Sequence, residues 1–249
     1  GSVDNFHESS FDDVAQAIQQ TLKYNTASMI LICCLLICAL HPAYVILGIA
    51  GIALKIYVHT KGRIDLEYTL DEETAIKYQQ KMDAWHEALS CNAVWQVLAE
   101  RNNSNLKVNA GAARTVSRHK LNTHVKLPFY VRSNVDAICL KLKNETLLIF
   151  PDKVFVIRSH KVGAIDLSEI RISVQPQAFI ESEHVPTDTQ ILGYTWQYVN
   201  KNGTPDKRYK NNRQLPRCLY GDITLWSASG LNVELQCSNH AKVQKISSN

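Results

Sequence analysis

The sequence predicts an α+β membrane protein with an N-terminal transmembrane helical hairpin, a linking helix, and then an antiparallel β sandwich or small barrel. Two observations predict this fold class. From Asn25 to Leu54 the chain carries no Asp, Glu, Lys or Arg. From Lys107 onward, short β-rich runs alternate with turn signals. A run without charge of that length is typical of a membrane segment, and regular short strands are typical of an antiparallel domain.

The expected organisation has four segments. In a chain of 249 residues there is room for a membrane hairpin and one domain of ordinary size. We expect an amphipathic lead-in over 1–23, the transmembrane hairpin over 24–58, the linking helix over 69–104 and a cytoplasmic β domain over 105–249. Apolar residues recur at helical spacing in the lead-in, namely Phe11, Val14, Ala15, Ile18 and Leu22.

The hairpin is predicted from the length of the apolar run and from His41-Pro42 at its middle. One crossing takes about 20 apolar residues, so Tyr24–Val58 is too long for one span and short for two. Proline is well tolerated at a helix start. We therefore expect helices over 22–40 and 42–57 joined by a tight turn. A single long tilted helix and a hairpin that dips without crossing remain as alternatives.

A cleaved signal peptide is a further alternative that fits less well. The residues before the apolar run are acidic rather than basic, including Asp4, Glu8, Asp12 and Asp13. Basic residues instead flank both ends of the run, namely Lys23, Lys55, His59, Lys61 and Arg63. Because basic flanks mark the cytoplasmic side, both ends of the hairpin are expected to be cytoplasmic.

Small residues in the second helix allow close helix packing. Gly48, Ala50, Gly51 and Ala53 lie near one another on a helix. They favour a homo-oligomer formed through the transmembrane helices, or are simply tolerated there.

The linking helix is predicted from its start signal and its apolar stripe. Thr69 to Glu72 reads as a capping box. The stripe is expected to pack against the β domain, with a short coiled-coil contact to a second subunit as the alternative; its members are Tyr78, Met82, Trp85 and Leu89.

The β domain is predicted to hold roughly seven to nine strands, as in a sandwich or barrel. Hairpin turns are expected at 143–145, 151–153 and 228–230. The β-rich runs are 137–142, 146–150, 153–158, 169–174, 190–199, 219–226 and 232–237.

Composition and motifs give no sign of catalysis. The seven cysteines contain no C-x-x-C pair, which argues against a disulfide framework or a zinc site. No nucleophile elbow, metalloprotease helix, Walker loop or dinucleotide fingerprint occurs. We expect no enzyme, no metal and no cofactor.

The densest polar constellation is the segment 201–217, which holds six basic residues and one acid, Asp206. Arginine forks bind phosphate or carboxylate, aromatic faces stack on bases, and turns such as Asn202-Gly203 expose N–H groups. The expected ligand-binding residues are Trp196, Tyr198, Lys201, Lys207, Arg208, Tyr209, Lys210, Arg213 and Arg217. A second basic stretch spans 107–126, where Arg114 and Arg118 either join this patch or lie separately on the surface.

This segment resembles a block of an uncharacterised family of bacterial proteins, W-x-Y-V-N-K-x-G-x-P-D-K-R-Y-K-x-N-R-Q-L-P. The resemblance extends to Phe150–Lys153, Lys161–Gly163 and Ser229–Leu231, and so covers most of 107–237. It implies a dedicated domain and a bacterial source, hence a location at the bacterial inner membrane, but no defined activity.

These observations lead to a hypothesis of a membrane-anchored cytoplasmic sensor or binding module for an anionic ligand, a nucleotide or another phosphate-bearing molecule. The expected partners are membrane lipid and an anionic small molecule or nucleotide, with nucleic acid left open. One alternative is a scaffolding protein whose basic face rests on anionic lipid. A remote alternative is a hydrolase of nucleic acid or nucleotides. The structural alternative for the segment 201–217 is a solvated basic hairpin between two strands, without a ligand and with Trp196 and Tyr198 as ordinary core residues.

Overall fold

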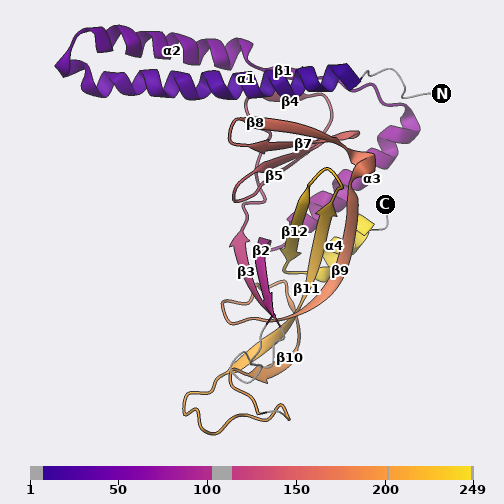
Figure 1. Ribbon diagram of the computed structural model, residues 1–249. Coiled ribbons are helices and arrows are strands. Elements are labelled where there is room, and N and C mark those ends of the chain that lie inside the picture. The colour runs from indigo at the N-terminus through magenta and orange to yellow at the C-terminus, as the bar shows by residue number, and fades with distance from the viewer. Residues whose placement is uncertain (1–7, 103–113, 201, 248–249) are drawn as a thin grey trace. The chain divides into compact units, whose positions relative to one another are not determined.

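The computed structural model describes residues 8–102, 114–200 and 202–247 (Figure 1). The chain divides into two compact units. Unit 1 comprises Gly1–Leu70, Val125–Leu140 and Asn144–Leu167, and unit 2 comprises Asp71–His124, Lys141–Lys143 and Ser168–Asn249. The segment 105–249, expected as one β domain, therefore contributes to both units.

Unit 1 begins with two helical segments that run antiparallel, side by side (Figure 1). Helix α1 spans Glu8–Cys33 and continues as a 3-10 helix, η1, over Cys34–Leu40. After His41-Pro42, helix α2 spans Ala43–Lys61. In the described part of the chain, two helical stretches are long and apolar enough to cross a membrane. They are Asp13–Ile37, which runs from α1 into η1, and Ala43–Lys61, which is α2. The predicted pair of helices divided at His41-Pro42 is confirmed.

Glycines let the two helices of this hairpin approach closely. A Cβ atom at Gly51 would lie 2.7 Å from the Cβ of Leu31 and 2.8 Å from the backbone nitrogen of Ile32. A Cβ atom at Gly48 would overlap the side chain of Leu35. Both glycines are buried, whereas Ala50 and Ala53 are exposed. The glycines of the small-residue group thus serve contacts within one chain.

The sheet of unit 1 has the order β5-β6-β7-β8. Its strands are β5 (Ile138–Lys141), β6 (Thr146–Ile149), β7 (Lys153–Arg158) and β8 (Lys161–Asp166). Strands β6 and β7, and β7 and β8, pair antiparallel. A separate parallel pair joins β1 (Ile64–Leu66) to β4 (Val131–Ser133).

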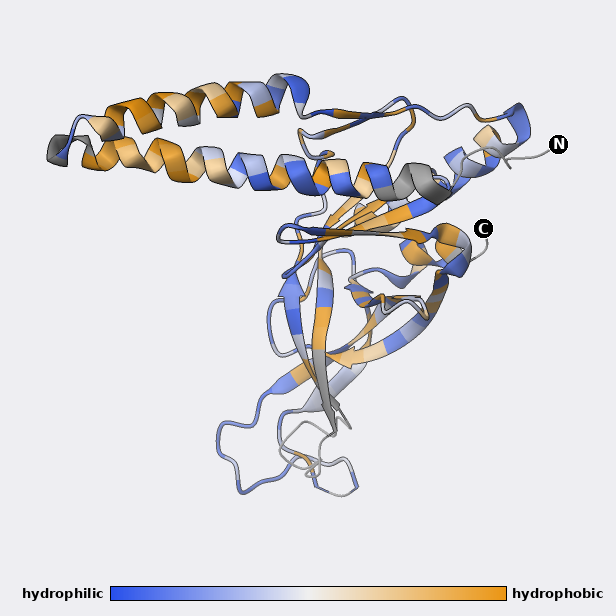
Figure 2. Ribbon diagram, turned by 45° about the horizontal axis from the view of Figure 1, so that its top comes forward, coloured by the Kyte–Doolittle hydropathy of each residue, from blue (hydrophilic) through white to orange (hydrophobic). Residues whose placement is uncertain are grey.

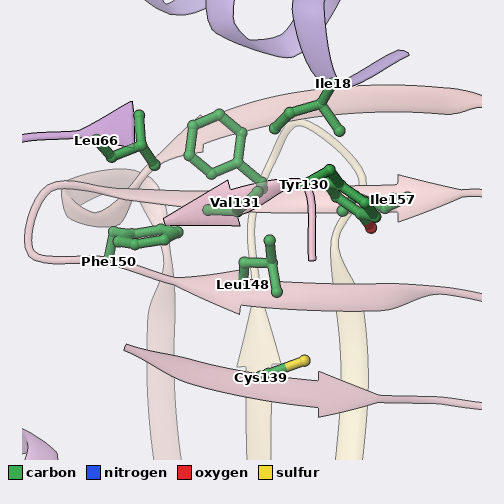
Figure 3. Close-up of a cluster of buried hydrophobic side chains, with 9 residues drawn as sticks. Ile18, Leu66, Tyr130, Val131, Cys139, Leu148, Phe150 and Ile157 are labelled. Carbon is green, nitrogen blue, oxygen red and sulfur yellow. The ribbon is translucent and has the colours of Figure 1, made fainter. Parts of the chain in front are cut away.

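The lead-in half of α1 belongs to the core of unit 1. Ile18 is fully buried in a cluster that includes Leu148 of β6 and Ile157 of β7 (Figure 3). Val14 and Leu22, one turn to either side, pack against the same cluster. The predicted amphipathic spacing is confirmed for these residues, while the side chain of Phe11 lies outside the described residues. Helix α1 thus changes role along its length, from a core helix to an arm of the hairpin.

Unit 2 is built on one larger sheet with the order β10-β11-β12-β2-β3. Strand β9 also belongs to this sheet and pairs with β11 along its whole length, Arg171–Ile180. All its strand pairs are antiparallel. The strands are β2 (Val94–Asn102), β3 (Arg114–Lys120), β9 (Arg171–Ile180), β10 (Gln190–Trp196), β11 (Gln214–Trp226) and β12 (Asn232–Cys237). A 3-10 turn, η2 (Leu167–Glu169), precedes β9.

Two helices of unit 2 pack against each other, α3 (Glu72–Leu89) and α4 (His240–Ser247). The predicted apolar stripe of α3 is buried over its whole length, from Tyr78 to Leu89. The helix ends at Leu89, and β2 follows from Val94, so the segment expected as linking helix over 69–104 is part helix and part strand. Helix α4 was not predicted; it packs on β11, where a Cβ atom at Gly221 would overlap Val243.

The predicted α+β class with antiparallel strands is confirmed. The sandwich or barrel is not, because the two antiparallel sheets belong to separate units and the described strands form no closed barrel. The three predicted hairpin turns do connect β5 to β6, β6 to β7 and β11 to β12.

Candidate anion-binding loop

The basic loop, residues 197–213, connects β10 to β11 in unit 2. Antiparallel register fixes both of its ends, because Trp196 pairs with Gln214 and Gly193 pairs with Arg217. Just inside the loop, Gln197 N–H donates to the carbonyl of Arg213 at 2.9 Å. The two ends of the loop are therefore held together as a continuation of the hairpin.

The first part of the loop is a tight turn closed by backbone hydrogen bonds. Asn200 N–H donates to the carbonyl of Thr204 at 2.8 Å, and Val199 bridges to Pro205. Gly203 has φ +81°, a left-handed conformation that favours glycine. This outcome agrees with the turn predicted at Asn202-Gly203.

The second part is organised by Asp206, which is only 3% exposed. Its Oδ1 accepts from the backbone N–H of Arg208 at 3.1 Å and from Arg208 Nε at 2.9 Å. The guanidinium also contacts the other carboxylate oxygen. The hydrogen bond to Asp206 raises the pKa of the Arg208 guanidinium. Arg208, although mostly exposed, is thus committed to a carboxylate of its own loop.

Stacking and an amide bridge connect the two arms of the loop. The rings of Tyr198 and Tyr209 stack with centroids 3.9 Å apart and an interplanar angle of 10°. The side chain of Asn212 accepts from the N–H of Tyr198 at 2.9 Å and donates to its carbonyl at 2.8 Å. An asparagine bound to both polar groups of one residue acts like a neighbouring strand. The loop therefore has a defined conformation despite its length.

Three predicted cations of this segment carry no partner among the described residues. Lys207, Lys210 and Arg217 are exposed, and their side chains make no hydrogen bond or ion pair there. Arg213 differs from them, because it donates to Gln197 Oε1 and to the carbonyl of Ser182, each at 3.2 Å. Lys201 lies outside the described residues. We refer to Lys207 and Lys210, together with Arg217 at the adjoining end of β11, as the loop cations.

A shallow recess of about 540 Å³ lies beside the second part of the loop. Its wall includes the paired Asp206 and Arg208 and the loop cation Lys207. The remaining lining residues are Asn200, Thr204 and Pro205. With the carboxylate neutralised by Arg208, Lys207 leaves the recess a net positive charge. Trp196 and Tyr198 are partly exposed, so they are not ordinary core residues, contrary to the structural alternative.

The expectation for Arg118 is wrong, since this side chain is only 9% exposed. Its guanidinium lies between the rings of Trp95 and Phe179, with Cζ 4.4 Å and 4.3 Å from the two centroids. Nη2 donates to both carboxylate oxygens of Glu181 at 3.1 and 2.9 Å. Lys107 and the side chain of Arg114, from the same basic stretch, lie outside the described residues.

The Arg118 cluster contains two further polar partners. Tyr220 donates to Glu181 Oε2 at 2.8 Å, and Arg118 Nη1 donates to Gln236 Oε1 at 3.0 Å. Burial, together with the charge of Glu181, raises the pKa of Tyr220. Because cation and carboxylate are paired with each other inside an aromatic enclosure, this cluster holds the sheet together rather than offering a binding site. No sequence signal links Arg118 to Glu181, which follows the end of β9 and lies 63 residues further along the chain.

The buried thiol of Cys91 donates to the carbonyl of Asn239 at 3.8 Å. Its interaction with the neighbouring thiol of Cys237 lowers the pKa of Cys91 and, with burial, raises the pKa of Cys237 well above its usual value. Their exposed fractions are 6% and 0%, so neither thiol is presented to a substrate. Among the residues that the structure describes, no group of three or more His, Cys, Asp or Glu side chains is placed to hold a metal ion.

Comparison with known protein families, with curated proteins and with solved structures gives no significant match. The resemblance of the 196–216 block to a bacterial family therefore stays a prediction.

Proposed function

We propose that the protein is a membrane-anchored binding module whose basic loop recognises an anionic ligand, a nucleotide or another phosphate-bearing molecule. The observation that supports it best is that the residues that fix the loop conformation are different from those that carry its unpaired positive charges. Asp206, Asn212 and the stacked tyrosines fix its conformation. The side chains of Lys207 and Lys210 project from this loop, and that of Arg217 from the adjoining end of β11, without partners among the described residues. A fixed backbone that presents unpaired cations reduces the entropy cost of binding an anion.

The anchoring part of the proposal is supported by the apolar exterior of the hairpin. Side chains such as Ile30, Leu36 and Ile46 are 64%, 85% and 71% exposed. A water-soluble surface rarely carries a contiguous apolar patch of this extent. With basic residues at the open end of the hairpin, the proposed location is the bacterial inner membrane, with both hairpin ends in the cytoplasm.

The ligand-binding part is tested on the full chain in detergent micelles with ATP as the probe. The variant K207Q/K210Q/R217Q removes the loop cations and leaves the contacts of Asp206 and Asn212 in place. We expect it to weaken ATP binding at least tenfold, because a charge-assisted hydrogen bond contributes about 1.5–3 kcal/mol. Isothermal titration calorimetry gives the affinities.

The matched control is K81Q/K120Q/K143Q, which removes three exposed positive charges from unit 2 outside the loop. It should bind ATP like the unchanged protein. Equal losses in both variants would reduce the effect to net charge. If the unchanged protein binds phosphatidylglycerol vesicles through the loop cations but no ATP, the scaffolding alternative replaces the proposal. Product formation from ATP would instead indicate the hydrolase alternative.

A further inference from the structure

The base of the hairpin in unit 1 gathers aromatic and polar side chains from four separate stretches of the chain. The register of α1 and η1 against α2 is set by Leu35 beside Gly48, Leu31 beside Gly51 and Thr21 beside Gly62. At this register Tyr24 of α1 lies level with the end of α2 near His59. Each step along either helix advances about 1.5 Å.

Three exposed aromatic residues lie at or near this level. Tyr24 is 40% exposed and Tyr57, two residues before His59, is 55% exposed. Phe129, from the segment before β4, stacks on His59 with centroids 4.3 Å apart and remains 36% exposed. Exposed aromatic rings at one level of an apolar helix pair are typical of a membrane–water interface.

Polar groups at the same level point away from the apolar part of the hairpin. Lys55 lies within the apolar stretch of α2, but its amine donates to Asn25 of α1, nearer the base. Thr26 Oγ1 is 2.7 Å from Nε2 of His160, in the turn between β7 and β8. Lysine side chains reach toward the interface in this manner when their backbone is in lipid.

Basic side chains surround the aromatic level. Lys23, Lys61, Arg63 and Lys161 are all exposed. Along α1 toward its N-terminus, the nearest carboxylate is Asp13, about 15 Å below Lys23. The segment after α2 adds two exposed carboxylates, Asp65 and Glu67, and the exposed Arg132 is the register partner of Asp65 on β4. The base of the hairpin therefore presents net positive charge.

The apolar part above this level is short. From Tyr57 to Ala43, α2 rises about 22 Å, while Thr26 to Leu40 rises about 26 Å when η1 is counted at about 2 Å per residue. A bilayer core is about 30 Å thick. Deeper insertion is blocked, because Ile18 and Val14 of α1 are packed in the core of unit 1. The hydrophobic colouring of both helices is densest toward their shared turn and mixes with hydrophilic residues toward the base (Figure 2).

We propose that unit 1 carries an interfacial collar, formed by Tyr24, Tyr57, Phe129, Lys23, Lys61 and Lys161, that binds the headgroups of an anionic lipid leaflet. The collar fixes the insertion depth, so the hairpin fits a hydrocarbon layer thinner than that of an average bilayer. This inference rests on the membrane anchoring proposed above. It names the lipid class and the bilayer thickness that the anchor selects.

The headgroup part is tested by partition of the full chain from micelles into oleoyl vesicles of phosphatidylcholine, with or without phosphatidylglycerol. The variant K23Q/K61Q/K161Q should reduce the preference for phosphatidylglycerol about fivefold per charge, on the order of a hundredfold in total. Its partition into phosphatidylcholine alone should stay unchanged. The control K207Q/K210Q/R217Q removes the same charge from unit 2 and should keep the preference. Loss of preference in the control alone would overturn the collar.

The thickness part uses mixed vesicles with myristoleoyl, oleoyl or erucoyl chains. We expect partition to be greatest in the thin myristoleoyl vesicles and least in the thick erucoyl vesicles. Equal partition in all three, or a maximum in erucoyl vesicles, would overturn the inferred fit while leaving the anchor in place. Absence of partition into any vesicle would overturn the proposed anchoring itself.

Discussion

Charged residues of unit 2 serve two purposes, and burial decides between them. Arg118 and Glu181 lie inside the protein and satisfy each other, whereas Lys207 and Lys210 stand in solvent. A buried ion pair gains little over well-packed apolar residues, but the loss of one partner leaves an uncompensated charge. An exposed cation contributes little to folding and is available to a ligand. Arg208 belongs to neither class, because its exposed guanidinium stabilises the loop through Asp206.

Replacement of Glu181 by alanine should destabilise unit 2 by about 3–5 kcal/mol, since Arg118 would remain buried without its carboxylate. The matched control is Lys245→Gln, which breaks an exposed pair with Glu87 and should cost less than about 1 kcal/mol. Urea unfolding in micelles, followed by tryptophan fluorescence, measures both. All four tryptophans lie in unit 2, so the signal reports this unit. Equal small losses would contradict a tightly enclosed pair.

Tyr220 should make unit 2 sensitive to alkaline pH. Burial and Glu181 raise the pKa of its phenol, so the folded state keeps this proton above pH ~10, where the unfolded chain releases it. The stability from this group is therefore complete below pH ~10 and falls above it, by about 1.4 kcal/mol per pH unit.

The variant Tyr220→Phe lacks this proton, and its free energy of unfolding should fall less steeply above pH ~10 by that amount. Below pH ~9 the two proteins should differ by a constant, the loss of the hydrogen bond to Glu181. Urea unfolding at a series of pH values provides the test. Parallel profiles over the whole range would show that the phenol ionises alike in the folded and unfolded states.

Helices and strands followed from the sequence where the signal is local. The runs 146–150 and 153–158 became β6 and β7, because a short run of β-rich residues and the turn at Pro151 act over a few positions. Features that depend on contacts between residues far apart in the sequence were not predicted. Helix α4 is short and polar, and it depends on the close approach that Gly221 permits. The position of Arg118 depends on Phe179 and Glu181, which the sequence places far away.

The candidate site shows the same limit. The composition of 201–217 identified a basic loop with a turn at Asn202-Gly203. The sequence could not show which cations are already used, because the pairing of Arg208 with Asp206 and of Arg213 with Ser182 depends on the folded loop. The structural role of Asn212 likewise appears only once Tyr198 lies beside it.

The α1–α2 contact should fail when Gly51 is replaced by leucine. The new side chain would meet Leu31 and the backbone of Ile32, so the helices must separate. Overpacking of this kind typically costs about 1–3 kcal/mol. The control Ala53→Leu places the same side chain on the exposed face of α2.

Thermal unfolding of the full chain in micelles, followed by circular dichroism, should show a lower transition for G51L and an unchanged one for A53L. Analytical ultracentrifugation of the same samples addresses the expected homo-oligomer. If A53L rather than G51L changes the molecular mass, the exposed alanines form a contact between subunits.

On the scale of the whole molecule, the chain alternates between the two units, crossing from one to the other five times before it ends in unit 2. The units are therefore not consecutive domains that can be separated by one cut. A fragment that begins at Lys61 would lack Ile18, which fills the core formed by Leu148 and Phe155. Loss of a fully buried side chain of this size typically costs several kcal/mol. Experiments on binding consequently need the full chain.

The last prediction concerns how the full chain is placed across the membrane. Single cysteines at Gln16, Glu67 and His41, all exposed positions, are introduced into a chain whose seven native cysteines are alanine. In intact cells, an impermeant maleimide should leave Q16C and E67C unlabelled, because the basic residues at the base of the hairpin keep both ends in the cytoplasm. H41C, at the turn, should be labelled if the bilayer thins to match the short hairpin. Labelling of Q16C or E67C alone would mean a single span, and protection of all three would mean a hairpin that dips without crossing. Labelling of all three after permeabilisation shows that every position is reactive.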